Sequence, residues 1–356
     1  MKTNLAASMT GAAVVGALIL LGVPLHSQAQ NPAWGLTAVP GLEVGHFTLS
    51  GRPTGCTVVL AEGGAVAGAD VRGGSPGTIE TELLDPVNTV QEIHGVVLSG
   101  GSAFGLDTSS GVRRYLEERG VGYKMGEILV PIVVGAIIYD LPVGDDPRIR
   151  PDADCGYRAA SQASRAAPPE GNVGAGAGAT VGKIRGMARA MKGGIGTASI
   201  RLETGLVVAA LVVVNAVGDV IDPNTGTVVA GVRTSDGHGL ADARELIRSG
   251  ASIEPEPGAN TTLGVVATNA RLTKAGATKV AQMAQDGLAR TIYPAHTPGD
   301  GDTVFSLAMG TFSGAASVST IGALAADVVA VAILRAVRAA TGIPGLPSSS
   351  DIDIGR

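Results

Sequence analysis

The chain has 356 residues, of which 45% are hydrophobic and only 16% charged, so it can bury a large core and is not a disordered protein. Its formal net charge of −5 and its aromatic content of 3% exclude nucleic-acid binding, which requires a basic surface and stacking side chains. The 53 glycines lie within apolar segments without a three-residue period, which favours close backbone packing over a collagen-like or linker sequence.

The N-terminal segment has the pattern of a secretory signal peptide. Lys2 precedes an apolar run over residues 12–25, and Ser27-Gln28-Ala29 is a small-x-small cleavage pattern. The run is shorter than the roughly 20 residues that span a bilayer, so a retained anchor is the weaker alternative. We therefore expect residues 1–29 to be removed, and the mature protein to be periplasmic or secreted without a membrane partner.

The first part of the mature chain predicts strands joined by glycine turns. Residues 42–70 alternate short apolar segments with Gly-rich turns, as an antiparallel meander does. Residues 95–105 predict a strand that leads through a glycine loop into a helix over 107–118, which Gly120 closes. This loop could bind a phosphate, but close packing explains its glycines equally well.

A second apolar run, residues 128–139, predicts a core strand that ends at Tyr139 and Asp140. Two polar groups at the end of such a strand are either satisfied structural partners or site residues. The two cysteines, Cys56 and Cys155, could pair in an oxidising compartment, but their spacing in the sequence leaves the pairing open.

Two further polar residues lie next to or within apolar segments. Lys183 follows a run of small residues whose spacing does not match a Walker A loop, so it is either a surface tip or a buried cation. Residues 206–217 predict a strand covered on both faces, and Asn215 lies inside it. A buried amide must find partners, so Asn215 either bridges to backbone or donates toward a reaction centre.

Thr261 lies at a junction between a loop and a strand, and it could serve as a catalytic nucleophile. The Pro- and Gly-rich loop 254–258 disfavours helix and central strand, whereas 261–268 predicts a buried strand. If the Asn260–Thr261 bond were broken, Thr261 would carry a hydroxyl nucleophile and a free α-amine as its base. The alternatives are an ordinary turn or a glycosylation acceptor sequence.

The remaining segments predict sheets with helices outside them. The expected elements are a polar connector over 230–256 with a short helix at 240–248, a helix over 274–290 capped by Thr273, a strand over 303–307, and a helix over 319–340 stopped by Gly342 and Pro344. Asp300 and Asp302 share one tight turn just before the third of these elements, for which an ordinary Asp-Gly turn is the simplest interpretation.

Taken in this order, these segments resemble the DmpA-like family of self-processing peptidases, the P1 family or peptidase family S58, which also contains the nylon-oligomer hydrolase. The resemblance extends from Gly35-Leu36-Thr37 through residues 98–106, Lys183 and Asn215 to the Asp300 turn. Members of this family cleave themselves immediately before a Ser or Thr, which becomes the nucleophile. The resemblance implies an α/β fold, namely a four-layer αββα sandwich of the N-terminal-nucleophile type.

The resemblance also implies roles for individual residues. The cleaved bond would be Asn260–Thr261, giving a larger fragment 30–260 and a smaller fragment 261–356 of one domain. Thr261 would be the nucleophile, and the other implied site residues are Lys183, Asn215, Asp300, Asp302 and the site-lining Tyr139. We expect Asn215 to donate to the oxyanion, Lys183 to keep the new amine neutral, and the two aspartates to orient and balance both cations.

The function implied is a self-cleaving amide hydrolase that needs no cofactor and no metal. An aminopeptidase-type activity on peptides or amino-acid amides and esters is the first expectation. An endo-acting 6-aminohexanoate oligomer hydrolase is the alternative, because the threonine nucleophile and the aspartate turn resemble that branch more closely. A non-catalytic exported binding protein, in which Asn260–Thr261 is only a loop, is the alternative of another class. The expected assembly is a homo-oligomer of processed units, a tetramer by resemblance.

Overall fold

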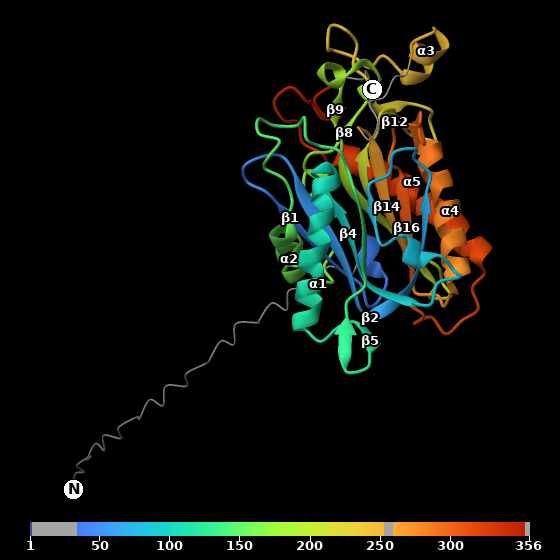
Figure 1. The fold of residues 1–356 in the computed structure, drawn as a ribbon. Helices are drawn as coiled ribbons and strands as arrows, with labels where there is room; N and C mark the ends of the chain where they lie inside the picture. Colours follow the sequence, from blue (N-terminus) through green and yellow to red (C-terminus); the bar gives the residue numbers. More distant parts are fainter. Residues whose placement is uncertain (2–33, 253–258, 353–356) are drawn as a thin grey trace. The chain divides into compact units, whose positions relative to one another are not determined.

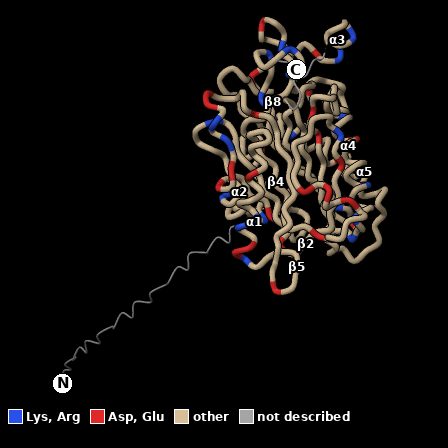
Figure 2. Tube along the Cα trace, viewed as in Figure 1, with Lys and Arg blue, Asp and Glu red and all other residues tan. Residues whose placement is uncertain are grey.

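The fold is described from a computed structural model that covers Met1, residues 34–252 and residues 259–352. The chain divides into two units, Met1–Gln30 and Asn31–Arg356, and every helix and strand described lies in the second. Residues 2–29 of the expected signal peptide and the whole Pro-rich loop at 254–258 lie outside the described residues. Figure 2 shows acidic and basic residues interspersed along the outer helices and loops, with the central strands almost free of charge.

A nine-stranded mixed sheet forms the centre of the second unit (Figure 1). Eight strands follow one another in the order β10-β11-β14-β16-β2-β4-β7-β3, and β1 pairs with β2 beside this path. Their bounds are β1 Glu43–Thr48, β2 Gly55–Val71, β3 Thr78–Ile79, β4 Glu92–Ser99, β7 Val133–Ile137, β10 Gly194–Arg201, β11 Val207–Asn215, β14 Thr261–Thr268 and β16 Thr303–Ala308. The β14–β16 and β4–β7 pairs are parallel, and the other pairs are antiparallel.

Helices cover the two outer surfaces of this sheet (Figure 1). The helices α1 (Thr108–Glu118) and α2 (Ala153–Ser161) pack on one side, and α4 (Lys274–Thr291) and α5 (Val318–Arg338) pack on the other. Within the described residues, α5 is the one helix long and apolar enough to cross a membrane, but it packs against α4, β10 and β11 as a core helix.

Three separate apolar cores show that the sheet is folded into two facing layers. One core joins α4 and α5 to β11, and another joins α1 and α2 to β2 and β4. The third lies between the two halves of the sheet, where Leu211 and Leu263 pack in the same cluster as Val96 and Val134. The 17-residue strand β2 connects the halves, since it pairs with β16 near one end and with β1 near the other. The architecture is the expected four-layer αββα sandwich.

The strand β11 shows why its sequence has no polar alternation. Val208, Ala210, Val212 and Val214 face the core beneath α4 and α5, whereas the residues between them face the core between the sheet halves. Successive side chains of a strand point to opposite faces, so a strand buried on both faces is apolar throughout. The prediction of a doubly covered strand is confirmed.

Most of the other predicted elements are also confirmed, including the cap of α4, where the Thr273 hydroxyl accepts the Gly276 N–H. The prediction of one core strand over residues 128–139 is wrong in part. Residues Ile128–Val130 form an exposed strand, β6, that pairs with β5 (Tyr123–Met125), and only β7 is buried. Pro131 separates the two, because a residue without an N–H interrupts a strand ladder.

The remaining elements are short and lie in the connections between these strands and helices. They are β8 Thr180–Val181, β9 Met191–Lys192, β12 Asp219–Ile221, β13 Val228–Ala230, β15 Ile292–Tyr293, α3 Ala243–Arg248, and the 3-10 helices Gly35–Ala38, Glu82–Leu84, Ser102–Asp107, Gly174–Gly176, Lys183–Arg185 and Met187–Arg189. The helix α3 lies within the predicted 240–248 segment, and the rest of the described part of the connector, residues 231–252, is mostly irregular as expected.

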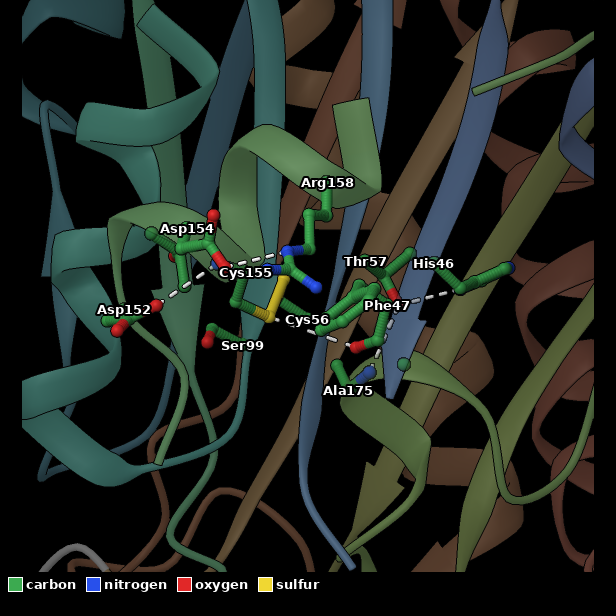
Figure 3. Close-up of a disulfide and its surroundings, with 12 residues drawn as sticks. His46, Phe47, Cys56, Thr57, Ser99, Asp152, Asp154, Cys155, Arg158 and Ala175 are labelled. Carbon is green, nitrogen blue, oxygen red and sulfur yellow. Dashed lines mark hydrogen bonds and ion pairs between the residues drawn. A yellow bond between two sulfur atoms is a disulfide. The ribbon is translucent and has the colours of Figure 1, made fainter. Parts of the chain in front are cut away.

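A disulfide joins Cys56 on β2 to Cys155 on α2, with 6.3 Å between their Cα atoms (Figure 3). The sequence left this pairing open. The bond ties a helix of one outer layer to a central strand across 99 residues of chain, and such a cross-link typically stabilises a fold by about 2–4 kcal/mol.

Candidate active site

Strand register brings together residues that are far apart in the sequence. Asn215, the last residue of β11, lies opposite Thr261, the first residue of β14. On the other side of β14, Asn260 forms a parallel bridge with Asp300, just before β16 begins. The predicted nucleophile therefore lies between the predicted amide and the predicted aspartate turn, and all four residues are almost completely buried.

Lys183 points into this cluster. Its ammonium donates to the backbone oxygen of Asn215 at 3.0 Å, to Asn215 Oδ1 at 3.0 Å and to the Ala259 carbonyl at 3.3 Å. The backbone N–H groups of Gly182 and Lys183 donate to Gly218 and Val217, which fixes the short helix that carries the lysine beside the end of β11. Of the two interpretations left open by the sequence, the structure favours a cation directed inward over a surface tip.

The side-chain amide of Asn215 uses both of its ends. Its Oδ1 accepts from the Thr180 N–H at 3.0 Å and the Thr180 hydroxyl at 3.2 Å, in addition to Lys183. Its Nδ2 donates to the Tyr139 carbonyl at 3.4 Å. Tyr139, expected to line the site with its side chain, thus contacts this cluster through its backbone.

The Asp300-Gly301-Asp302 turn is buried and tightly bonded. Asp300 accepts the Thr297 N–H at 2.7 Å, while Asp302 Oδ1 accepts the Thr262 N–H at 2.6 Å. The other oxygen of Asp302 accepts the backbone N–H of His296 at 3.0 Å and lies 2.9 Å from its Nδ1. Asp302 therefore connects the residue after the nucleophile to His296.

His296 is a site neighbour that the sequence analysis missed. It lies outside any predicted element, six residues before Asp302, and its backbone has a positive φ of 58°. A non-glycine residue in this region is uncommon and is found where surrounding contacts hold it. The signal available in the sequence was its place in the irregular segment 294–299, which leads directly into the Asp300 turn.

The carbonyl oxygen of the Asn260–Thr261 peptide bond, the bond expected to break, accepts hydrogen bonds from two donors. The Thr261 hydroxyl donates to the Asn260 carbonyl oxygen, and the Gly301 N–H donates to the same oxygen at 2.8 Å. A side chain at position 301 would meet the nucleophile, because a Cβ built there lies 2.7 Å from Thr261 Oγ1. Position 301 therefore requires glycine for close approach rather than for a special φ angle.

Burial shifts the charges of the cluster toward neutrality. Desolvation lowers the pKa of Lys183 to about 7, against the opposing effect of Asp300, Asp140 and Asp302. Desolvation, with the neighbouring Asp302 charge, raises the pKa of Asp300 to about 6. A lysine and a carboxyl that both titrate near neutral pH are typical of functional sites, although buried ion networks share this property.

Two other buried ions have structural surroundings. Asp140 accepts from Arg52, from the Thr54 hydroxyl and from the Gly101 N–H, so it is a satisfied partner of the glycine turn that could have bound phosphate. The Asp140 carboxylate therefore accepts the Gly101 N–H that a bound phosphate would have used. Lys192 donates to three backbone carbonyls and is fully buried. Its pKa is lowered to about 7 by desolvation, so a lowered lysine pKa does not by itself mark the site.

Comparison with known proteins decides the family. The family model for peptidase family S58 matches residues 35–349, which is most of the chain. The chain belongs to peptidase family S58. The S58 peptidase is 43% identical to an uncharacterized aminopeptidase of Mycobacterium leprae, over 93% of this chain and 95% of the relative. It is 31% identical to the 6-aminohexanoate-oligomer endohydrolase of an Agromyces species, over 92% and 96%.

Solved structures show the same fold. The L-aminopeptidase D-Ala-esterase/amidase of Ochrobactrum anthropi, described as a variant of the Ntn hydrolase fold, has a TM-score of 0.67 and 20% identity over 90% of this chain and 92% of that chain. A Burkholderia β-aminopeptidase has a TM-score of 0.62 and 24% identity over 87% of each chain. The expected family and fold class are confirmed, and the S58 peptidase is a hydrolase of amide or peptide bonds.

Proposed function

We propose that this S58 peptidase is a self-cleaving hydrolase whose nucleophile is Thr261, freed by cleavage of the Asn260–Thr261 bond. The observation that carries the proposal is the contact of the Thr261 hydroxyl with the Asn260 carbonyl, the group that it would attack. Lys183 and Asn215 on one side, and the Asp300 turn on the other, supply charged and polar groups around this contact.

The cleavage proceeds as an acyl shift followed by hydrolysis. The Thr261 oxygen bonds to the Asn260 carbonyl carbon, the C–N bond to Thr261 breaks, and the hydroxyl proton passes to the departing nitrogen. Water then hydrolyses the ester, which leaves a carboxylate on Asn260 and restores the threonine hydroxyl. In the processed enzyme the free α-amine takes the hydroxyl proton when Thr261 attacks a substrate amide.

The pH dependence of the processed enzyme tests whether the amine is the base. Activity on small amides is expected to rise with pH along a limb somewhere below the ~7.7–8.0 of a free α-amine, because burial disfavours the ammonium form and Lys183, where it is charged at about pH 7 and below, disfavours a second ammonium. Asp300→Asn and Asp302→Asn are expected to move this limb to lower pH, because removing a negative charge makes the protonated amine less favourable. The measurement is a pH–rate profile of all three proteins, and identical limbs would remove the aspartates from the site.

The substrate proposed is the amide of an amino acid or short peptide, by analogy with the relatives named as aminopeptidases. One observation favours an endo-acting enzyme instead. In the uncleaved chain Lys183 donates to the Ala259 carbonyl, one residue before the bond to be broken. If substrates follow the same path, the lysine would bind a second carbonyl on the acyl side, which a free N-terminal amino acid lacks.

Paired substrates separate these two possibilities. The processed enzyme is assayed on alanine p-nitroanilide and on its N-acetyl derivative, which has that second carbonyl in place of a free, protonatable amine. An aminopeptidase is expected to hydrolyse the free amine at least about tenfold faster in kcat/KM, and an endo-acting enzyme the acetylated compound. Aminohexanoate oligomers extend the panel, and an intact, inactive chain would favour the non-catalytic binding protein.

We also propose that the enzyme is exported and assembles as a homo-oligomer of processed units. The Cys56–Cys155 disulfide supports export, because such bonds persist in oxidising compartments. N-terminal sequencing of the larger fragment from the native host checks the expected signal cleavage after Ala29. Sedimentation of the processed protein checks its assembly, for which the tetramer is the expectation.

A further inference from the structure

The carbonyl oxygen of Asn260 accepts a hydrogen bond from a backbone N–H that could not be identified from the sequence. The N–H of Gly301 donates to it at 2.8 Å, from the centre of the Asp300-Gly301-Asp302 turn. The turn itself is held from several sides. Ser75 donates its N–H to the Asp300 carbonyl at 2.8 Å, and the Thr303 hydroxyl donates to the Gly301 carbonyl at 2.9 Å. The N–H is therefore fixed before any reaction begins.

We propose that the backbone N–H of Gly301 is the oxyanion donor of the self-cleavage step, an inference that rests on the proposed function. When the Thr261 oxygen bonds to the Asn260 carbonyl carbon, negative charge develops on the Asn260 oxygen. The intermediate collapses when the bond to the Thr261 nitrogen breaks and that nitrogen gains the hydroxyl proton. A backbone donor held about 2.7–3.1 Å from the oxygen on which charge develops is the usual arrangement for stabilising such an intermediate.

The surroundings of Asn215 support this assignment. The sequence analysis expected its amide to be the oxyanion donor, but in the uncleaved chain its Nδ2 donates to the Tyr139 carbonyl. Its Oδ1 is occupied by Thr180 and Lys183. Asn215 is thus a positioning residue that holds the lysine against the end of β11, while the scissile oxygen is bound from the opposite side by main chain.

The identity of residue 301 fits the same role. A Cβ at this position would lie 2.7 Å from the Thr261 hydroxyl oxygen and 3.1 Å from the Ser75 carbonyl oxygen. Both distances are shorter than ordinary carbon contacts, so any side chain would push the nucleophile or the turn away. Glycine permits the N–H and the hydroxyl to reach the same carbonyl oxygen together.

Replacing a single amide by an ester tests the donor without adding a side chain. Glycolic acid is incorporated at position 301 by nonsense suppression in cell-free synthesis, which exchanges the N–H for an oxygen. The matched control carries glycolic acid at Gly74, whose N–H donates to the Thr297 carbonyl at 3.2 Å in the adjoining loop. Conversion of each full-length chain into its two fragments is followed by denaturing gel electrophoresis.

The expected result is cleavage slowed by about 10²–10³-fold in the position-301 ester, the usual effect of losing one oxyanion donor. The Gly74 ester should process within about threefold of the wild-type rate. A position-301 ester that processes at the wild-type rate would overturn the proposal, whereas a wild-type chain that never cleaves would overturn the proposed function itself.

A second measurement does not depend on the folding of the ester chain. In Thr261→Ala, which cannot cleave, selective labelling places ¹⁵N at Gly301 and ¹³C at the Asn260 carbonyl. A scalar coupling across the N–H···O=C hydrogen bond is expected between these two nuclei by NMR. Its absence in the folded Thr261→Ala chain would also overturn the proposal.

Discussion

Thr261→Ala is expected to give one intact, folded chain without hydrolase activity, whereas the wild-type chain separates into two fragments. The substitution removes the only atom of residue 261 that can attack the Asn260 carbonyl. Edman sequencing of the smaller wild-type fragment should begin Thr-Thr-Leu-Gly-Val. A wild-type chain that stays intact after prolonged incubation would contradict the proposal.

Thr262 provides a matched control for this experiment. It is the next residue of β14, is as buried as Thr261, and has a hydroxyl without a hydrogen-bond partner within the described residues. Adjacent strand residues point to opposite faces, so the Thr262 hydroxyl lies away from the Asn260 carbonyl. Thr262→Ala should therefore cleave at close to the wild-type rate. Thr261→Ser, which keeps a hydroxyl at the reacting position, should also cleave.

The strands and helices were predictable because their residue patterns reflect local geometry and burial. The run around β11 predicted a strand covered on both faces, and Thr273 predicted the start of α4, because both signals lie within a few adjacent residues. The sequence could not give the register that sets Asn215 opposite Thr261, since pairing between strands 46 residues apart depends on the whole sheet. The site residues came from family resemblance instead.

Sequence analysis missed contacts of two kinds. Some are made by backbone groups, and others by side chains that lie outside any recognisable sequence pattern. Gly301 looked like the middle of an ordinary Asp-Gly turn, because a backbone N–H has no residue type to signal it. His296 lies in an irregular loop, where no periodicity indicates which way a side chain points. Lys192 sits in a two-residue strand, and its burial follows from the carbonyls that the glycine-rich loop 176–179 turns toward it.

Lys183→Met is expected to lower the rate of self-cleavage and the kcat of the processed enzyme by about 10²-fold, the size of effect that misplacing reacting groups by about 1 Å can have. The substitution keeps a similar length and volume but removes the charge that bonds Asn215 and Ala259. It should lower the melting temperature less than Lys192→Met does, because Asn215 Oδ1 keeps its two Thr180 donors and Ala259 is only half-buried.

Lys192→Met is the matched control, because both lysines are directed inward onto backbone carbonyls and have pKa values lowered to about 7. The ammonium of Lys192 bonds the carbonyls of Gly176, Ala179 and Gly193. Its loss removes three buried hydrogen bonds from an ammonium, although the Gly176 and Ala179 carbonyls each keep one backbone N–H. The expected cost is about 1–3 kcal/mol in the free energy of unfolding, while activity per folded molecule stays near wild type. Melting curves and rates measured on the same samples separate the two effects. If Lys183→Met lost stability and kept its rate, Lys183 would be a structural cation like Lys192. Neither self-cleavage nor turnover at Thr261 would then depend on the charge of Lys183.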